Sequence, residues 1–560
     1  MKAYWGRYPT GDYETPESAK LITQAYRELF SSPPPYVALD VETPSLKDQR
    51  VMGVGFATPS NDNFYFDLAD SDFPWHLLLP SGVRKIWHNA TFDLAWEALG
   101  KYGADLDNIE DTAIITRMLN MNVVLSVAAL DTTARTESAG DLLKRFKVKN
   151  MTQLPWSEVA LKCINDARVT LKLYEKYRSK VNQTNYLVDL KVTSLLLHQS
   201  HRGIQLDKLL VNNIEYEMAK QVATYDRILP FNYRSPQQVA IALGSTKPPI
   251  FLPWVRSKAT GKSHPDTSKG ILENLDHLLP MTIIKARKYT KLHGVIKSMV
   301  DKDRVFSHFH LDSATRRITS ENIQMHNLPV GSRPDDIIPE SGPIRRVLVP
   351  DSGEWTRFDL SQVELRVLTR YTGDPRMSQA LNTPKGQGPD IHETTMNTLG
   401  IHSRVMAKNF NFGSIFGGDI PILATFTGIK DHDLLRRYQQ LYFSTYAATK
   451  NWIDQQRYQG LRDGFVTTLY GQRLSLDIPM RMGVRHAGNC AINYPIQGSA
   501  AEIFKRILIA LSETIPISDF VLQVHDEELI EGRHILPEQE LSHITDFWTP
   551  LETSVIKRWQ

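Results

Sequence analysis

The chain contains very little cysteine. Only Cys163 and Cys490 occur in its 560 positions, far apart and in no metal-ligand spacing. We therefore expect neither a disulfide framework nor a structural zinc site. Long apolar runs are missing too: no stretch could span a bilayer, and the first residues lack the apolar core of a signal peptide. These absences predict a cytoplasmic protein with no membrane partner.

Neither sign of charge is in clear excess. The 65 Lys and Arg residues against 62 Asp and Glu residues give a formal net charge of +3. Such a balance does not indicate a nucleic-acid binder unless the basic residues are clustered. The length of 560 residues, with 41% hydrophobic and 23% charged side chains, predicts a globular protein of several domains.

Four acidic residues distinguish the first part of the chain. They follow predicted strands or lie on predicted helices, and they are Asp40, Glu42, Asp93 and Asp166. The elements predicted around them are strands at 36–39, 51–56 and 64–66, a run from 84 to 89 leading to a helix over 90–99, and a helix over 164–177. Four carboxylates are suited to two Mg²⁺ ions that hydrolyse a phosphodiester.

The stretch 357–366, RFDLSQVELR, marks a second acidic site. Residues 355–360 predict a short strand followed by a helix, so Asp359 stands at the end of the strand, where it can project into a cleft. A distant apolar run, 521–524, leads to Asp526. Two aspartates at two strand ends are what a two-metal phosphoryl-transfer site requires.

One predicted helix, residues 404–417, carries a stripe of cations and aromatic rings. They recur at every fourth position, in the order Arg404, Lys408, Phe412 and Phe416. A stripe of phenylalanines alone would more often belong to a core. Two cations in register with two rings instead favour a nucleotide-binding face, with the cations on a triphosphate and the rings against sugar and base.

The middle of the chain predicts helices and loops. Asp207 and Ser235 open helices, residues 245–270 predict a loop, and residues 305–311 alternate as a half-buried strand. A helix over 283–300 carries a row of cations: Lys285, Arg287, Lys288, Lys291 and Lys297. The row predicts salt-dependent contacts with phosphates, and a solvated helix face is an equal alternative.

These motifs resemble those of family A DNA polymerases, the bacterial DNA polymerase I type, over most of the chain. DLSQVELR is similar to the family's DYSQIELR, VHDE at 524–527 to its second palm motif, and the helix over 404–417 to its RxxxKxxxFGxxYG. The four early acids resemble the 3′–5′ exonuclease domain that precedes such polymerases. The implied fold is multidomain α/β and α+β: an RNase H-like exonuclease domain at 1–185 and a right-hand polymerase domain at 186–560, with thumb about 205–303, palm about 304–385 and 470–560, and fingers about 386–469.

The resemblance also implies roles for individual residues. The catalytic set is Asp359, Asp526, Glu527 and Lys408, with Asp40, Glu42, Asp93 and Asp166 in the exonuclease domain. Two Mg²⁺ ions per site, replaceable by Mn²⁺, are implied at Asp359, Leu360 and Asp526, and at Asp40, Glu42 and Asp166. The dNTP-binding set is Gln362, Glu364, His392, Arg404, Lys408, Phe412 and Phe416. The DNA-binding set is Arg317, Asn322, Gln324, Asn493, Gln497, His525, Lys285, Lys288 and Lys291.

Three positions depart from the family's pattern. Lys162 stands where the exonuclease has a tyrosine that orients the attacking water, four residues before Asp166. A lysine can hydrogen-bond a hydroxide there, but it also competes electrostatically with the metals. In the polymerase part, Phe416 replaces a tyrosine and Asn489 replaces an arginine. Asp111, by contrast, matches the family's structural aspartate.

The implied function is template-directed DNA synthesis from dNTPs at a primer 3′ end, with 3′–5′ proofreading. The layout resembles a monomeric phage replicative polymerase acting in the host cytoplasm. Its expected partners are primer–template DNA and replisome proteins, namely a helicase-primase, a single-strand binding protein and a processivity factor. Two alternatives stay open: an exonuclease whose polymerase-like half only binds duplex, and a non-catalytic duplex-binding or interaction protein.

Overall fold

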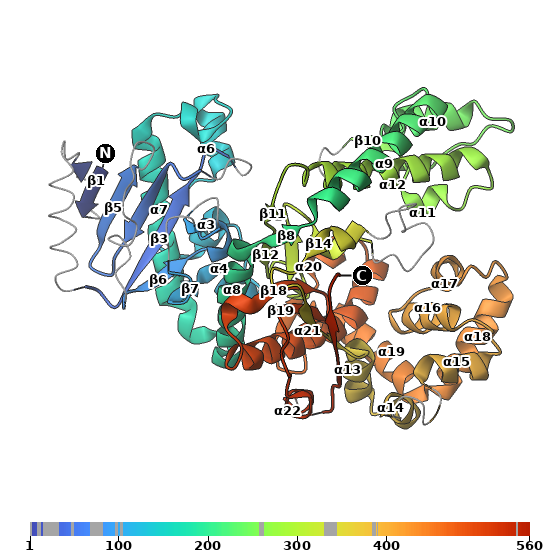
Figure 1. The fold of residues 1–560 in the computed structure, drawn as a ribbon. Coiled ribbons are helices and arrows are strands. Elements are labelled where there is room, and N and C mark those ends of the chain that lie inside the picture. The colour runs from blue at the N-terminus through green and yellow to red at the C-terminus, as the bar shows by residue number, and fades with distance from the viewer. Residues whose placement is uncertain are drawn as a thin grey trace.

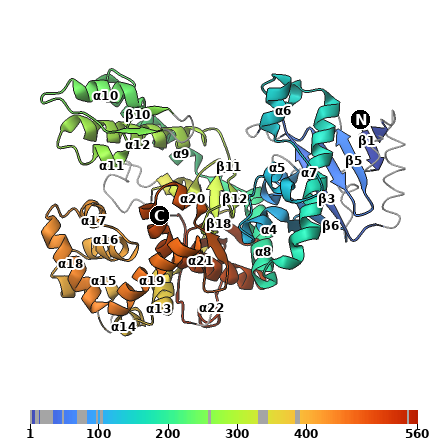
Figure 2. The ribbon, with the colours of Figure 1, turned by 180° about the vertical axis from the view of Figure 1, so that it is seen from behind.

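The structure is a computed structural model that describes residues 3–7, 13–14, 33–45, 50–67, 82–95, 99–100, 105–256, 262–329, 344–382, 388, 390–544 and 547–559. Figures 1 and 2 show it from opposite sides, with an N-terminal lobe beside a larger part. In the larger part, the helices of residues 208–297 lie together on one side and those of residues 375–445 on another. The end of the chain lies between these two groups of helices.

A seven-stranded sheet forms the N-terminal lobe, in the order β2-β1-β5-β4-β3-β6-β7. Its strands are β1 (Ala3–Arg7), β2 (Tyr13–Glu14), β3 (Tyr36–Glu42), β4 (Gly53–Ala57), β5 (Asp62–Asp67), β6 (Arg84–Trp87) and β7 (Ile109–Asp111). Strands β3 to β5 form an antiparallel meander, and β6 runs parallel to β3. The predicted strands of this lobe are confirmed.

The lobe also contains helices. They are α3 (Ala90–Asp93), α4 (Thr112–Met118), α5 (Leu125–Ala128), α6 (Ala139–Phe146) and α7 (Trp156–Tyr177). Of these, α7 packs along strands β3, β4 and β5. The helix predicted near 164–177 is confirmed within α7. The helix predicted over 90–99 is wrong in length, because the chain turns after Asp93 and buries Leu94 and Ala95 in the core.

Helix α8 (Gln183–Arg202) joins the lobe to the rest of the molecule. Near its start, the Tyr186 hydroxyl donates to Oε2 of Glu110 on β7 at 2.6 Å. Near its end, the Gln199 amide donates to Oε1 of the buried Glu528 at 2.6 Å. A single rigid helix thus contacts the sheets of both parts.

A buried ion cluster lies about a third of the way along α8. Asp189 accepts hydrogen bonds from Lys505 Nζ at 2.6 Å and from Arg316 Nη1 at 3.0 Å. All three side chains are at least 93% buried, and Arg316 has a left-handed φ of +57°. Removing one member would leave a buried charge unpaired, which is strongly destabilising. The cluster therefore fixes three distant segments to each other.

The helices beyond α8 form the thumb-like group at the upper right of Figure 1. Its elements are α9 (Lys208–Ile228), α10 (Pro236–Gly244), β9 (Trp254–Arg256), β10 (Ser263–Pro265), α11 (Lys269–Leu272) and α12 (Leu278–Lys297). Asp207 caps α9 and Ser235 caps α10, as predicted. The prediction of a loop over 245–270 is wrong in part, because β9 and β10 pair as a hairpin. The β9 side chains are exposed, so no apolar alternation marks this strand in the sequence.

A four-stranded antiparallel sheet, β18-β19-β15-β20, lies at the centre of the larger part. Its strands are β15 (Trp355–Leu360), β18 (Phe520–Val524), β19 (Glu527–Glu531) and β20 (Leu551–Ile556). Helices α13 (Val363–Thr372), α20 (Asp477–Arg481), α21 (Val484–Ser512) and α22 (Glu538–Ser542) accompany it. The strand and helix predicted around Asp359 are confirmed.

Other short strands are β8 (Ile204–Leu206), β11 (Arg304–Val305), β12 (His308–His310), β13 (Thr319–Glu321) and β14 (Leu348–Val349). They form two separate small sheets, β11-β8-β14 and β12-β13. The single strand predicted over 305–311 is wrong. Strand β11 pairs with β8, whereas β12 pairs with β13 in a different sheet, so the chain must break between them.

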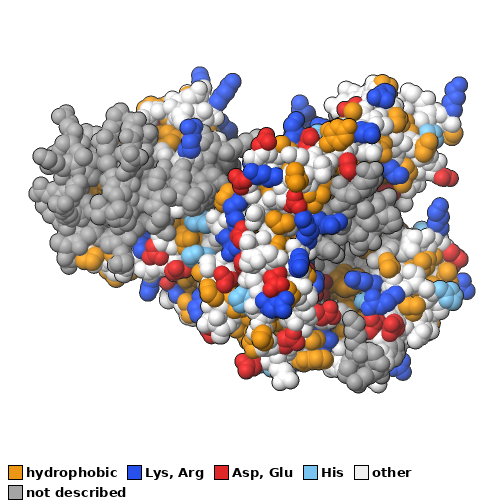
Figure 3. All heavy atoms as spheres, in the orientation of Figure 1, with side chains coloured by type: hydrophobic (Ala, Val, Ile, Leu, Met, Phe, Trp, Pro, Cys, Tyr) orange, Lys and Arg blue, Asp and Glu red, His pale blue; other side chains and the backbone are white. Residues whose placement is uncertain are grey.

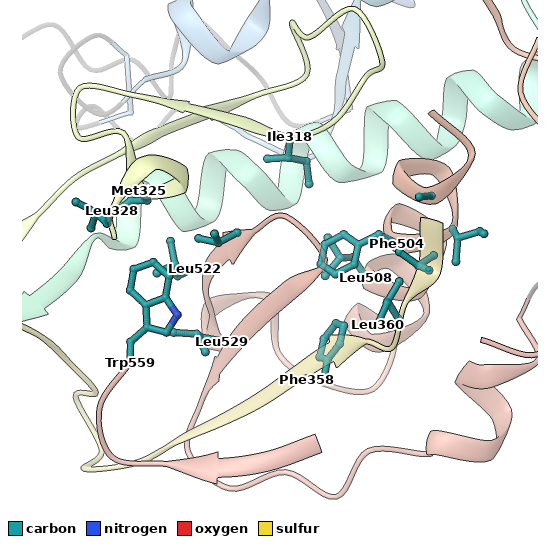
Figure 4. Packing of buried hydrophobic residues seen from close by; sticks show 14 of the residues in the cluster. Ile318, Met325, Leu328, Phe358, Leu360, Phe504, Leu508, Leu522, Leu529 and Trp559 are labelled. Atoms are coloured by element: carbon teal, nitrogen blue, oxygen red, sulfur yellow. The ribbon is translucent and has the colours of Figure 1, made fainter. Parts of the chain in front are cut away.

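The core beneath the central sheet is apolar and continuous (Figure 4). The rings of Phe358 on β15 and Phe504 on α21 lie 5.8 Å apart. Trp559, near the end of the chain, is fully buried beside Leu522 and Leu529 of the neighbouring strands. This packing fixes the strand ends that carry Asp359 and Asp526.

The remaining helices form the group at the lower right of Figure 1. They are α14 (Pro375–Asn382), α15 (Ile391–Leu399), α16 (Arg404–Ile415), α17 (Ile420–Thr427), α18 (His432–Thr445) and α19 (Ala447–Asp463), followed by the hairpin β16 (Phe465–Thr467) and β17 (Arg473–Ser475). The helix predicted from 404 is confirmed. The predicted palm–fingers boundary at 385–386 lies outside the described residues. Within the described ranges, no helix is both long enough and apolar enough to cross a membrane.

Candidate active sites

The central sheet brings Asp359 and Asp526 together. Asp359 lies near the end of β15, and Asp526 lies in the turn between β18 and β19. The Leu360 N–H donates to the Asp526 carbonyl at 3.1 Å, which fixes the two strand ends side by side. Burial raises the pKa of Asp359 to about 6 and that of Asp526 to about 7, and the charge of Asp359 adds to the rise at Asp526. A cation between these carboxylates would relieve both penalties.

Glu527, the neighbour of Asp526, has both carboxylate oxygens engaged. Oε1 accepts from the Trp559 indole N–H at 2.5 Å, and Oε2 accepts from Arg357 Nε. The Arg345 guanidinium lies 3.9 Å from the centre of the Trp559 ring. The structure therefore gives this predicted catalytic residue a fixed structural setting. Arg357 and Trp559 are not among the site residues predicted from the sequence, although Arg357 lies two residues before Asp359 and so projects from the same face of β15.

Glu364 and Arg317 meet at the edge of the central site. Glu364 lies in the first turn of α13 and forms an ion pair with Arg317, which precedes β13. The charges of both act on the pKa of Asp526, with Arg317 lowering it and Glu364 raising it. Gln362 precedes α13 with a left-handed φ of +53°, and its buried Oε1 has no hydrogen-bond partner among the residues that the structure describes.

Helix α16 presents the predicted stripe. Lys408 is exposed, and its ammonium group opposes the rise in the pKa of Asp359, so the helix faces the central carboxylates. Phe412 and Phe416 are half-buried, with ring centres 5.9 Å apart and planes at 28°. Arg404 forms an ion pair with Asp390.

His392 lies behind this stripe. Its ring centre is 6.2 Å from that of Phe412, and its Nδ1 lies 2.9 Å from the Asn411 amide nitrogen. Burial lowers the pKa of His392 to about 4, so the imidazole is neutral at pH 7. A neutral ring can donate one hydrogen bond to an anion without a desolvated charge of its own.

The predicted DNA-binding residues are spread over several elements. Asn493 and Gln497 lie half-buried on α21, and the Asn493 amide donates to the Asn489 carbonyl at 2.9 Å. His525 has a left-handed φ of +58°, and its ring centre is 5.5 Å from that of His326. The others, exposed near β13, are Asn322 and Gln324.

The cations of α12 have different roles in the structure. Lys285 and Lys291 are exposed and Lys288 is half-buried. Arg287 instead points inward, with Nε donating to the Tyr233 carbonyl at 2.7 Å. Figure 3 shows Lys and Arg side chains in small groups, interspersed with acidic side chains, over the visible face. The described surface in this view therefore has no single dominant basic patch.

The N-terminal lobe brings together its own four acids. Asp40 and Glu42 lie on β3, Asp93 ends α3, and Asp166 lies on α7. Removal from water raises the pKa of Glu42 to about 7, and it also raises the pKa of Asp40 and of Asp93. Three of the acids, Asp40, Glu42 and Asp93, line a cavity of about 840 Å³. Carboxylate oxygens are the donors that Mg²⁺ and Mn²⁺ accept, so the donor set of both sites fits a hard divalent cation.

Asp111 has the structural setting that the sequence predicts. Its carboxylate accepts from the backbone N–H groups of Ala90 at 2.8 Å and Ala113 at 2.7 Å. It thereby holds the starts of α3 and α4 together, and α3 carries Asp93. Asp111 acts on the backbone around the acidic site and does not face its cavity.

Comparisons with known proteins agree with this layout. A family model described as DNA polymerase family A matches residues 205–549, and one described as 3′-5′ exonuclease matches residues 13–182. DNA polymerase I of Pseudomonas aeruginosa is 26% identical, over 90% of this chain and 60% of that protein. DNA polymerase I of Chloroflexus aurantiacus is 30% identical, over 82% of this chain and 51% of that protein. The chain thus spans about half to three fifths of the length of these curated relatives.

A solved structure has the same fold. It is described as the POL domain of Pol1 from M. smegmatis in complex with DNA primer-template and dNTP. The two chains superpose with a TM-score of 0.70 over 95% of this chain and 98% of the other, at 21% sequence identity.

Proposed function

Because this chain belongs to DNA polymerase family A, we propose that it is a template-directed DNA polymerase that adds dNTPs to a primer 3′ end. The observation that carries the proposal is the pair of half-buried carboxylates, Asp359 and Asp526, beside the cationic face of α16. A duplex-binding platform alone has no use for paired, half-buried acids whose pKa is raised. The N-terminal lobe is proposed to remove nucleotides from the 3′ end.

Asp359, Asp526 and the backbone of Leu360 would hold Mg²⁺, with Mn²⁺ able to substitute. The bound ions would lower the pKa of the primer 3′-hydroxyl and neutralise charge on the leaving pyrophosphate. The chain itself supplies positioning and electrostatics. Lys408 and Arg404 bind the triphosphate, and the neutral His392 donates a hydrogen bond to it.

Selection of the nucleotide falls to the residues around this centre. The rings of Phe412 and Phe416 cover the sugar and the base, and Glu364 occupies the space that a ribose 2′-hydroxyl would need. Arg317, ion-paired with Glu364, lies where it can contact the minor-groove acceptors common to all correct base pairs. Sugar selection and sensing of the primer end are thereby coupled through one ion pair.

The finer predictions rest on the sequence resemblance alone. They are a phage replicative role in the host cytoplasm, a monomeric state, and replisome partners such as a helicase-primase, a single-strand binding protein and a processivity factor. Exposed lysines on α12, Lys285 and Lys291, support contact with duplex phosphates.

Primer extension on a labelled primer–template tests the proposal. The protein is incubated with Mg²⁺, with and without dNTPs, beside Asp359→Ala and Asp40→Ala. We expect extension to be lost only in Asp359→Ala and shortening to be lost only in Asp40→Ala. Shortening without extension by the unaltered protein would instead support an exonuclease with a duplex-binding half. The absence of both activities would support a non-catalytic binding protein.

A further inference from the structure

One ammonium group lies among the four acids of the N-terminal lobe. Lys162 Nζ is 2.7 Å from Glu42 Oε1 and 2.7 Å from Asp166 Oδ2. The Lys162 side chain is only 10% exposed, and those of Glu42 and Asp166 are 6% and 10% exposed. Lys162 is therefore a buried cation at the centre of the site.

The position of Lys162 is fixed by both elements that carry the acids. Lys162 lies one turn before Asp166 on α7, and Glu42 reaches it from β3. The second oxygen of Asp166 accepts from the Thr136 hydroxyl, so both of its oxygens are already engaged. A flexible surface lysine would have no such restraints.

The remaining acids keep more freedom. Among the residues that the structure describes, the Asp40 carboxylate contacts the weak thiol donor of Cys163, with Sγ 3.5 Å from Oδ2. Asp93 accepts a long backbone hydrogen bond from the Val41 N–H at 3.3 Å. Lys162 thus supplies a hydrogen bond to two of the four carboxylates, those of Glu42 and Asp166. The other two, Asp40 and Asp93, remain available to a metal ion.

We propose that Lys162 is a resident cation that replaces one of the two divalent ions expected at the exonuclease site, so that this site binds one divalent ion and excises slowly. An ammonium group within hydrogen-bond distance of two carboxylates excludes a metal ion from the same place, through its volume and its charge. The number of bound divalent ions follows from this geometry alone. The slow excision rests also on the proposed exonuclease function.

The first test counts bound ions by the electron paramagnetic resonance of Mn²⁺ titrated into the full-length protein. Lys162→Met removes the charge and keeps the chain length, and Lys162→Tyr installs the residue of the exonuclease motif. Lys172→Met is the matched control, because Lys172 lies on the same helix and pairs with Glu175 at 2.8 Å, away from the four acids. Ions bound in the palm contribute equally to every variant.

We expect both Lys162 variants to bind one more Mn²⁺ per chain than the unaltered protein and the control. An unchanged count in both, with melting temperatures that show folded protein in the presence of Mn²⁺, overturns the proposal. Because two variants are used, a folding failure in one leaves the other to decide.

The second test measures shortening of a single-stranded oligonucleotide under single-turnover conditions without dNTPs. A rise of about tenfold or more in Lys162→Met is expected, because a second divalent ion would add stabilisation of charge in the transition state. If the ion count rises but no protein shortens the strand, the exonuclease function fails and the resident cation stands. If the count is unchanged and shortening falls, Lys162 acts in catalysis itself and the proposal fails.

Discussion

The two acidic centres of this protein are built from the same side chains and neutralised in different ways. In the N-terminal lobe, Lys162 lies 2.7 Å from two of the four acids. At the central sheet, Asp359 lies 3.5 Å from Arg357, and Arg357 contacts Glu527 more closely. In the N-terminal site the cation is paired with acids of the site itself, whereas in the central site Arg357 is paired more closely with the neighbouring Glu527.

The local backbone geometry decides whether each cation pairs with an acid of the site or with a neighbouring glutamate. Lys162 and Asp166 are one turn apart on a helix, so their side chains meet directly. Arg357 and Asp359 share one face of β15, and Glu527 on the adjacent strand draws Arg357 aside. Asp359 and Asp526 therefore remain available for ions that arrive with the substrate.

The largest expected effect comes from removing one palm carboxylate. Asp526→Asn should lower primer extension by about 10³-fold or more, because the site loses a ligand for the ions that stabilise the transition state. Shortening of the strand should be unchanged, which primer extension and single-strand degradation measure together. Asp519→Asn, on the segment that leads into the same strand, is the control. Equal loss of both activities would break the separation of the two centres.

Removal of Glu364 would leave Arg317 without its ion-pair partner, so the central site would have a cation beside its acids, as the N-terminal site has Lys162. Glu364→Ala should raise ribonucleotide incorporation by about 10²-fold. The reason is that exclusion of the ribose 2′-hydroxyl by the Glu364 side chain should contribute about 3 kcal/mol to discrimination between the two sugars. Incorporation of rNTPs against dNTPs on one template measures it. Glu354→Ala removes another ion-paired palm glutamate and should change nothing. An unchanged sugar preference in Glu364→Ala would remove this residue from the selection of sugars.

A smaller effect is expected at the residue that holds Glu527. Trp559→Phe keeps most of the buried ring but deletes the N–H that binds Glu527 Oε1. The loss of one buried partner should lower the free energy of unfolding by about 1–3 kcal/mol, and extension should fall several-fold through displacement of Asp526. Urea unfolding and extension rates check this. Trp548→Phe is the control, since Trp548 is 38% exposed and also lies beneath an arginine.

The last prediction concerns the pH dependence of stability in metal-free protein. Folding raises the pKa of Asp359 to about 6 and those of Asp526 and Glu42 to about 7, so the folded state binds more protons than the unfolded state. Stability should therefore fall as pH rises from about 4 to about 7, with at most about 1.4 kcal/mol per pH unit from each group. Urea unfolding across this range measures the slope. Asp526→Asn should flatten it, and an identical slope in that variant would contradict the assignment.

Local patterns in the sequence predict the main elements around the central site. The strand that ends near Asp359 and the stripe from Arg404 to Phe416 follow from periods of two and nearly four, which depend only on neighbours along the chain. The resemblance to a known family assigns the four early acids to one site. The roles of these residues are predictions, which the experiments above test.

Contacts between distant segments could not be predicted in this way. Trp559 reaches Glu527 only because the end of the chain returns to the central sheet. The inward turn of Arg287 depends on a carbonyl from a separate helix–loop segment. All three side chains of β9 in the β9–β10 hairpin are exposed, so burial leaves no periodic signal in that strand. Each of these features depends on tertiary packing.

The ion cluster around Asp189 has a consequence for anyone who divides the protein into fragments. Asp189 belongs to α8 and neutralises Lys505 and Arg316, which both lie on the polymerase side. A polymerase fragment should therefore begin ahead of the Asn182 cap, with all of α8 retained. A fragment that began after Asp189 would carry two orphaned buried cations and should be recovered mainly as insoluble material.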